Sequence, residues 1–105
     1  MRKVFFGLMF CFSLFLFAKE DSLTVGLCAA YPPFESRDAN TAEIVGFDVD
    51  LANELGKILN KKIVIKDAEW QALLGGLKNG HYDVIISAMS KQEAGVNNVN
   101  LSDTY

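Results

Sequence analysis

The sequence predicts an α/β fold in which helices flank a parallel sheet. Three short apolar runs, rich in β-branched residues, alternate with segments whose apolar residues recur at helical spacing. Strands and helices that alternate in this way are typical of a parallel sheet with right-handed crossovers. The three runs are LTVGLC (23–28), KIVIK (62–66) and VIIS (84–87).

The first predicted strand, residues 23–28, leads into a long segment, 29–43, that we expect to be a loop. Pro32 and Pro33 disfavour a helix there, and the segment also holds turn-forming polar residues. A short extended piece over 44–46 then leads into the first helix.

That helix is the clearest in the chain. Its apolar residues follow helical spacing, and Asp48 stands where a side chain would cap the helix start. These apolar residues are Phe47, Leu51, Leu55, Ile58 and Leu59.

A second helix is predicted after the 62–66 strand. Trp70, Leu73, Leu74 and Leu77 share a helical stripe, and Asn79–Gly80 is typical of a left-handed C-terminal cap. After the third strand we expect a weak helix near Ser90, because the glycine and asparagines that follow are poor helix formers.

Residues 1–18 are predicted to be a secretory signal peptide. Arg2 and Lys3 precede an uncharged apolar run of 15 residues, 4–18, and charged residues follow. Such a run is short for a membrane span, which needs about 20 residues, and its order suits a leader cleaved after Ala18. The alternative is a retained N-terminal anchor. We reject a lipoprotein signal at Cys11, which lies inside the apolar run.

The exported chain would be acidic and would hold a single cysteine. Removing residues 1–18 leaves 87 residues with 8 basic and 13 acidic side chains, a net charge of −5, and only Cys28. This composition argues against a nucleic-acid binder and excludes an intramolecular disulfide. Cys28 is expected to be a small buried hydrophobe, and His81 a solvated turn residue. We expect no metal site, no cofactor and no catalytic residues.

In a parallel sheet, ligands bind beyond the carboxyl ends of the strands. The segments at those ends are Tyr31–Phe34, Asp67–Trp70 and Ala88–Ser90. Ser90 also stands at a probable helix start, where free N–H groups attract anions. Its alternative role is a plain N-terminal cap.

These segments, in this order and spacing, resemble the family 3 extracellular solute-binding proteins, the periplasmic polar-amino-acid receptors of ABC importers. The resemblance rests on LTVGLCAAYPPFE (23–35), VGFDVDLANELGKIL (45–59), EWQALLGGLKNGHYDVIISAMS (69–90) and VNLSDTY (99–105). It implies a periplasmic-binding-protein-like fold with two lobes around a cleft. Residues 19–105 would then be part of lobe 1, an N-terminal fragment.

The resemblance also implies ligand-binding roles. Tyr31 would pack on the ligand, Ser90 would contact its α-carboxylate, and Ser87 and Ala88 would supply backbone groups. Trp70 would form a second wall of the cleft. Its helical stripe with Leu73 and Leu77, however, is equally typical of a core residue. Relatives carry Arg where this chain has Gly95. Losing one partner of a buried charge pair costs roughly 2–5 kcal/mol of binding free energy. Lys91 would replace the missing Arg only in part.

We therefore expect the solute-binding component of an ABC importer, for an amino acid or a related small polar solute. It would be a periplasmic monomer, not an enzyme, with the membrane permease as its partner. The fragment alone is expected to show no measurable affinity for single amino acids. The alternatives are a cyclohexadienyl-dehydratase-like enzyme, a sensory input domain on the same scaffold, and a nonfunctional truncated product.

Overall fold

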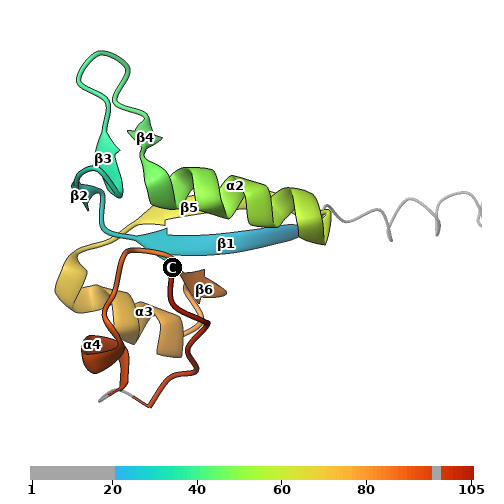
Figure 1. Ribbon diagram of the computed structural model, residues 1–105, viewed down its shortest axis with the longest axis vertical. Coiled ribbons are helices and arrows are strands. Elements are labelled where there is room, and N and C mark those ends of the chain that lie inside the picture. The colour runs from blue at the N-terminus through green and yellow to red at the C-terminus, as the bar shows by residue number, and fades with distance from the viewer. Residues whose placement is uncertain (1–20, 96–97) are drawn as a thin grey trace, which may run out of the picture.

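The computed structural model describes residues 21–95 and 98–105, and its larger sheet carries helices on both faces (Figure 1). This sheet is parallel, with strand order β5-β1-β6. It consists of β1 (Ser22–Leu27), β5 (Lys62–Asp67) and β6 (Val84–Ile85). The predicted α/β fold with a parallel sheet is confirmed. The predicted signal peptide lies outside the described residues.

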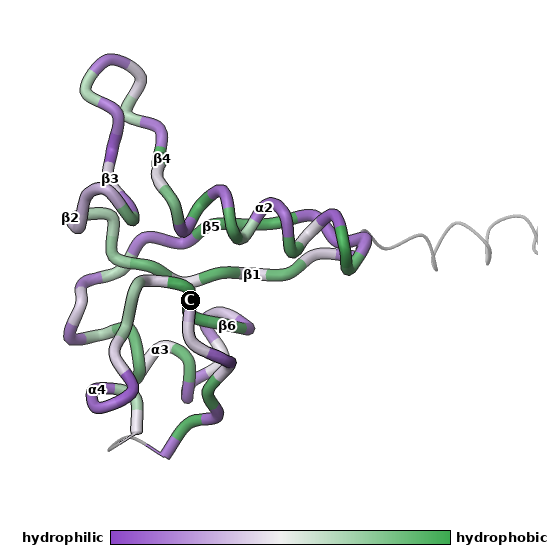
Figure 2. Tube along the Cα trace, viewed as in Figure 1, coloured by the Kyte–Doolittle hydropathy of each residue, from purple (hydrophilic) through white to green (hydrophobic). Residues whose placement is uncertain are grey.

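Helix α2 (Phe47–Leu59) covers one face of this sheet. Ala52 is fully buried against Val25 of β1 and Ile86 beyond β6, and partly buried aliphatic side chains complete the cluster. Figure 2 shows an almost continuous apolar course along β1, whereas α2 alternates between hydrophilic and hydrophobic bands. The helix therefore buries one stripe and leaves its other side to solvent.

The opposite face is covered by a 3₁₀ turn, η1 (Trp70–Ala72), and by α3 (Leu73–Lys78). Neighbouring strand residues point to opposite faces, so Gly26 faces away from Val25. The Tyr82 ring fills the space over Gly26, also lies against Gly76, and donates its hydroxyl hydrogen to the carbonyl of Leu73 at 2.5 Å. Gly80, which follows α3, has φ +76°, in agreement with the left-handed C-terminal cap predicted at Asn79–Gly80.

The predicted loop over 29–43 is in part wrong, because the segment contributes strands to a second sheet. Its strands are β2 (Ala30–Tyr31), β3 (Glu35–Arg37) and β4 (Ile44–Val45), antiparallel in the order β2-β3-β4. The strands are only two or three residues long, too short to show an alternating pattern in the sequence. Asp38 orders the β3–β4 turn by accepting the N–H groups of Asn40 and Thr41 at 2.8 and 3.0 Å.

Asp48 does not cap α2, contrary to the prediction. The cap residue is Gly46, and the backbone N–H groups of Phe47 and Asp48 donate to the carbonyls of Pro33 and Phe34 at 3.1 and 2.9 Å. The turn between β2 and β3 thus satisfies the helix start, and the Asp48 side chain is free to point inward. Gly46 has φ +131°, and a Cβ there would lie 2.3 Å from the Phe34 carbonyl oxygen.

The last helix, α4 (Lys91–Gly95), is a single short turn, as the poor helix formers predicted. Within residues 21–95 and 98–105, no helix has both the length and the apolar character needed to span a membrane.

The close packing of Tyr82 on Gly26 predicts that Gly26→Ala is destabilising. The added Cβ would lie 2.6 Å from two ring carbons, so the ring must shift, and we expect a loss of about 1–3 kcal/mol in unfolding free energy. The matched control is Gly75→Ala in α3, where a Cβ meets nothing within 4 Å. It should be neutral or stabilise by up to ~1 kcal/mol. Urea unfolding followed by Trp70 fluorescence measures both; equal stabilities would contradict the packing argument.

Candidate functional site

Side-chain hydrogen bonds hold the carboxyl ends of the three parallel strands together. The Ser87 hydroxyl, beyond β6, accepts the N–H of Cys28 at 3.1 Å, and the Asp67 carboxylate, ending β5, accepts the N–H of Ala29 at 3.0 Å. The arrow of β1 ends at this edge in Figure 1, beside β2 and the start of the η1–α3 region. The segments predicted to carry the site are therefore joined at one edge of the sheet.

Tyr31 belongs to a row of aromatic rings at this edge. Its ring lies 5.2 Å from Phe34, Phe34 lies 6.5 Å from Phe47, and Phe47 stacks on Tyr105 at 6.1 Å. Tyr31, Phe47 and Tyr105 are each about half exposed. The sequence pointed to Tyr31 alone, since nothing local indicates that Tyr105 stacks on Phe47. Exposed rings in such a row suit packing against an aliphatic chain or a cation.

Trp70 begins η1 directly after β5 and is partly exposed, whereas Leu73 of the same predicted stripe is fully buried. The N–H of Trp70 lies close enough to the Cys28 thiol to act on its pKa. The backbone of Trp70 therefore lies at the end of β1, and its side chain is less buried than that of Leu73.

The remaining predicted site residues follow β6. Ser87 is buried and its hydroxyl is fully engaged within the protein. The N–H of Ala88 donates to the Tyr105 hydroxyl at 3.1 Å. The Ser90 hydroxyl and N–H both donate to the Glu93 carboxylate, and the Glu93 N–H donates back to Ser90. Ser90 thus forms a capping box, the alternative that its sequence position left open.

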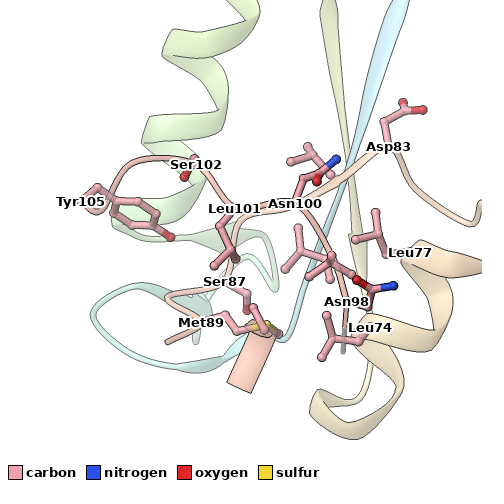
Figure 3. Close-up of a pocket in the computed structure, with 14 residues that line it drawn as sticks. Leu74, Leu77, Asp83, Ser87, Met89, Asn98, Asn100, Leu101, Ser102 and Tyr105 are labelled. Atoms are coloured by element: carbon pink, nitrogen blue, oxygen red, sulfur yellow. The ribbon is translucent and has the colours of Figure 1, made fainter. Parts of the chain in front are cut away.

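Two cavities border this region. One, of about 290 Å³, is lined by Phe34, Ala88, Ser90 and Tyr105 among others. The larger, of about 520 Å³, lies between α3, β6 and the C-terminal segment and has a mainly aliphatic lining (Figure 3). Ala88 and Ser90 thus meet two of the aromatic rings at the smaller cavity. Gly95 is exposed at the end of α4 and offers no side chain to an anion.

Beneath the aromatic row lies a pair of carboxyl groups that no local sequence pattern indicates. Glu35 and Asp48 are both 0% exposed. Glu35 accepts a hydrogen bond from Ser87, but Glu35 Oε2 and both Asp48 oxygens accept no hydrogen bond from any described residue. Burial, followed by contact with Asp48, raises the pKa of Glu35 from 4.5 to about 8. A protonated Glu35 can donate to the Asp48 carboxylate, which satisfies both side chains with one shared proton.

Tyr105 closes over this pair. Burial of its hydroxyl, with the nearby Asp48 and Glu35 carboxyls, raises the pKa of Tyr105 to about 12, so the phenol stays protonated. The side chain therefore belongs both to the aromatic row and to the lining above the carboxyl pair.

The potential at the sheet edge is negative. Burial raises the pKa of the Cys28 thiol, and the carboxylates of Asp67 and Glu69 and the Glu35 side chain raise it further. Arg37 offsets part of this charge through an ion pair with Asp67 at 3.1 Å. Cys28 is partly exposed, not buried as expected, but an uncharged thiol here is a poor nucleophile. His81 is exposed, as predicted, and in the described part of the chain no three metal-ligating side chains are placed to hold an ion.

Three comparisons with known proteins bear on this site. Residues 23–105 match the family model of the bacterial extracellular solute-binding proteins, family 3. The chain is 36% identical over 89 residues to ABC transporter arginine-binding protein 1 of Escherichia coli, covering 85% of this chain and 36% of that protein. It is 32% identical over 75 residues to the L-cystine-binding protein TcyA of Bacillus subtilis, covering 71% of this chain and 28% of that protein.

Among solved structures, the chain is similar to the arginine-bound form of domain 1 from TmArgBP. The two share 44% identity with a TM-score of 0.75, over 80% of this chain and 66% of that chain. The same arginine-binding protein, from T. maritima, has also been solved in its holo form, of which this chain covers 37%. The chain therefore spans about a third of the length of the whole relatives it matches.

The shared proton predicts that stability falls as pH rises from about 4.5 to about 8. Over this interval Glu35 keeps its proton in the folded state, whereas the unfolded chain has released it. Because the folded state binds more protons, the free energy of unfolding decreases as the pH rises. Glu35→Gln should flatten this part of the profile, while Glu43→Gln, an exposed carboxyl on the β3–β4 turn, should leave it unchanged. Urea unfolding at half-unit pH steps measures this, and parallel profiles for all three proteins would contradict the assignment.

Proposed function

The chain belongs to the family 3 bacterial extracellular solute-binding proteins, and on that basis we propose that it binds a cationic amino acid for delivery to an ABC importer. The observation that carries the proposal is that aromatic rings and only partly compensated acidic side chains lie together at one edge of the sheet. Rings attract cations through their faces, and a negative potential raises the local concentration of a positively charged solute. Two of the similar proteins named above are described as arginine-binding, which supports the same class of ligand.

In this proposal each site residue has a separate task. Tyr31 packs on the aliphatic part or the cationic head of the ligand, and Trp70 forms the facing wall. The α-carboxylate lies near Ala88 and Ser90, where it displaces the Tyr105 hydroxyl and the Glu93 carboxylate from the N–H groups that they now accept. Because Gly95 supplies no guanidinium, the carboxylate is held weakly. Recognition then depends more on the positive end of the ligand than it does in relatives that carry Arg.

The first lobe would supply the larger share of the contacts. The solved domain 1 of TmArgBP is in an arginine-bound form, which supports binding by a first lobe. We therefore replace the expectation that a lone first lobe has no measurable affinity with weak binding of cationic amino acids. In a complete two-lobe protein, ligand bridging both lobes would favour the closed state and strengthen binding.

An enzyme on the same scaffold is less well supported. The relatives named above are binding proteins. The carboxyl pair that could serve acid–base chemistry, Glu35 and Asp48, is fully buried and beyond reach of a substrate at the edge.

The proposal places the protein outside the cytoplasmic membrane, exported by the leader over residues 1–18. We predict cleavage after Ala18, so that the exported protein begins at Lys19 and loses its basic start. Intact-mass measurement and N-terminal sequencing of the exported protein test this. A chain that keeps residues 1–18 and stays with the membrane fraction would establish the anchor instead.

We predict that the exported chain binds L-arginine about 3- to 30-fold more tightly than L-citrulline. Citrulline has nearly the same shape without the positive charge, and a cation on an aromatic face is worth about 0.5–2 kcal/mol. Tyr31→Ala should weaken arginine binding about 3- to 30-fold, on the same energy scale. Ile58→Ala, a 79% exposed residue near the C-terminal end of α2, serves as control. Calorimetry measures all of these, and equal affinities for arginine and citrulline would refute the proposal.

A further inference from the structure

A chain of polar contacts links Cys28, at the end of β1, to the buried carboxyl pair. The N–H of Cys28 donates to the Ser87 hydroxyl, and that hydroxyl donates to Glu35 Oε1. Glu35 in turn faces Asp48, so four parts of the fold meet here: the ends of β1 and β6, β3 and the first turn of α2. Ser87 is 1% exposed and both carboxyls are 0% exposed, so water does not screen this path.

The pair must hold a proton for structural reasons alone. Two ionised carboxylates side by side in a buried site repel each other, and such a pair keeps one proton between them. The groups that face the pair are Ser87 from the end of β6, Tyr105 from the C-terminal segment and, at longer range, Cys28 from the end of β1. Each of these is a neutral donor or a protonated acid, so none supplies the positive charge that would let both carboxyls ionise.

We propose that the Glu35–Asp48 pair is a proton site coupled to the ligand, so that a cation bound at the sheet edge expels the shared proton. This inference rests on the proposed function, because it requires a positively charged ligand there. In the step, the Glu35 Oε2–H bond breaks, the proton passes to solvent buffer, and the ligand's charge balances the second carboxylate. Below about pH 8 the pair is thus doubly ionised only while the ligand is bound.

The coupling is physically reasonable because Glu35 and Cys28, at the end of β1, already interact electrostatically. The Glu35 carboxyl contributes to the raised pKa of the Cys28 thiol. In the proposed function the cationic group of the ligand lies beside Tyr31, at the same end of β1 as Cys28. Across a buried region of low dielectric, two opposite charges several ångströms apart interact much more strongly than in water.

The direction of the effect follows from linkage. A nearby cation favours the ionised carboxyl and lowers the pKa of Glu35, so binding releases up to one proton at pH values between the bound and free pKa. Apparent affinity for a cationic ligand therefore increases as pH rises towards about 8, by at most tenfold per pH unit, and then levels off.

Calorimetry of L-arginine binding to the exported chain in two buffers tests this. Phosphate and Tris take up protons with different heats, so the difference in binding heat at one pH gives the number of protons released. We expect release of between zero and one proton at pH 7, falling towards zero above about pH 8.5. Glu35→Gln should abolish the release and make affinity independent of pH. The matched control Glu43→Gln should release as many protons as the unchanged chain.

The outcomes separate this inference from the proposed function. Arginine binding with the same heat in both buffers between pH 6 and 8 overturns the proton coupling and leaves the function standing. Proton release that persists in Glu35→Gln also overturns it, since another group is then responsible. Absence of arginine binding at every pH refutes the proposed function, and the coupling with it. If Glu35→Gln fails to fold, Asp48→Asn and the two-buffer measurement on the unchanged chain decide the question.

Discussion

The buried contact between Ser87 and Glu35 is the interaction on which the rest of this structure depends. It joins the end of the parallel sheet to the small antiparallel sheet, and Ser87 also holds the N–H of Cys28. Through Asp48 the same contact reaches the first turn of α2. Because buried polar groups are costly when unpaired, removing any member leaves the others without a partner, so the network favours a single arrangement of the sheet edge.

This arrangement also explains why aromatic and acidic side chains lie together at one edge of the sheet. The β2–β3 turn caps α2 through the Pro33 and Phe34 carbonyls, and it sets Tyr31 and Phe34 beside Phe47. The carboxylates near Cys28 stand at the ends of neighbouring strands, where parallel pairing brings them together. One short turn thus supplies helix capping and the start of the aromatic row.

The elements set by local pattern were predictable, whereas those set by distant contacts were not. The strands of the parallel sheet and α2 follow from hydrophobic spacing, and Tyr31 was found because it follows a strand end. An acidic residue near a helix start is most often a cap, which is the role that local sequence assigns to Asp48. Its burial beside Glu35 depends on contacts with Ser87 and Tyr105, which are distant in sequence. Likewise, β2 and β3 are too short to show a pattern, and the pairing of Tyr105 with Phe47 spans most of the chain.

The free thiol of Cys28 has a practical consequence. It is the only cysteine after residue 18, it is partly exposed, and it directly follows the end of β1, where the backbone N–H of Trp70 approaches its thiol. A fluorophore attached there would report ligand arrival directly, with no engineered attachment point. Since burial and nearby carboxylates raise the pKa of this thiol, labelling would proceed faster in mildly alkaline buffer, and an occupying solute would slow it.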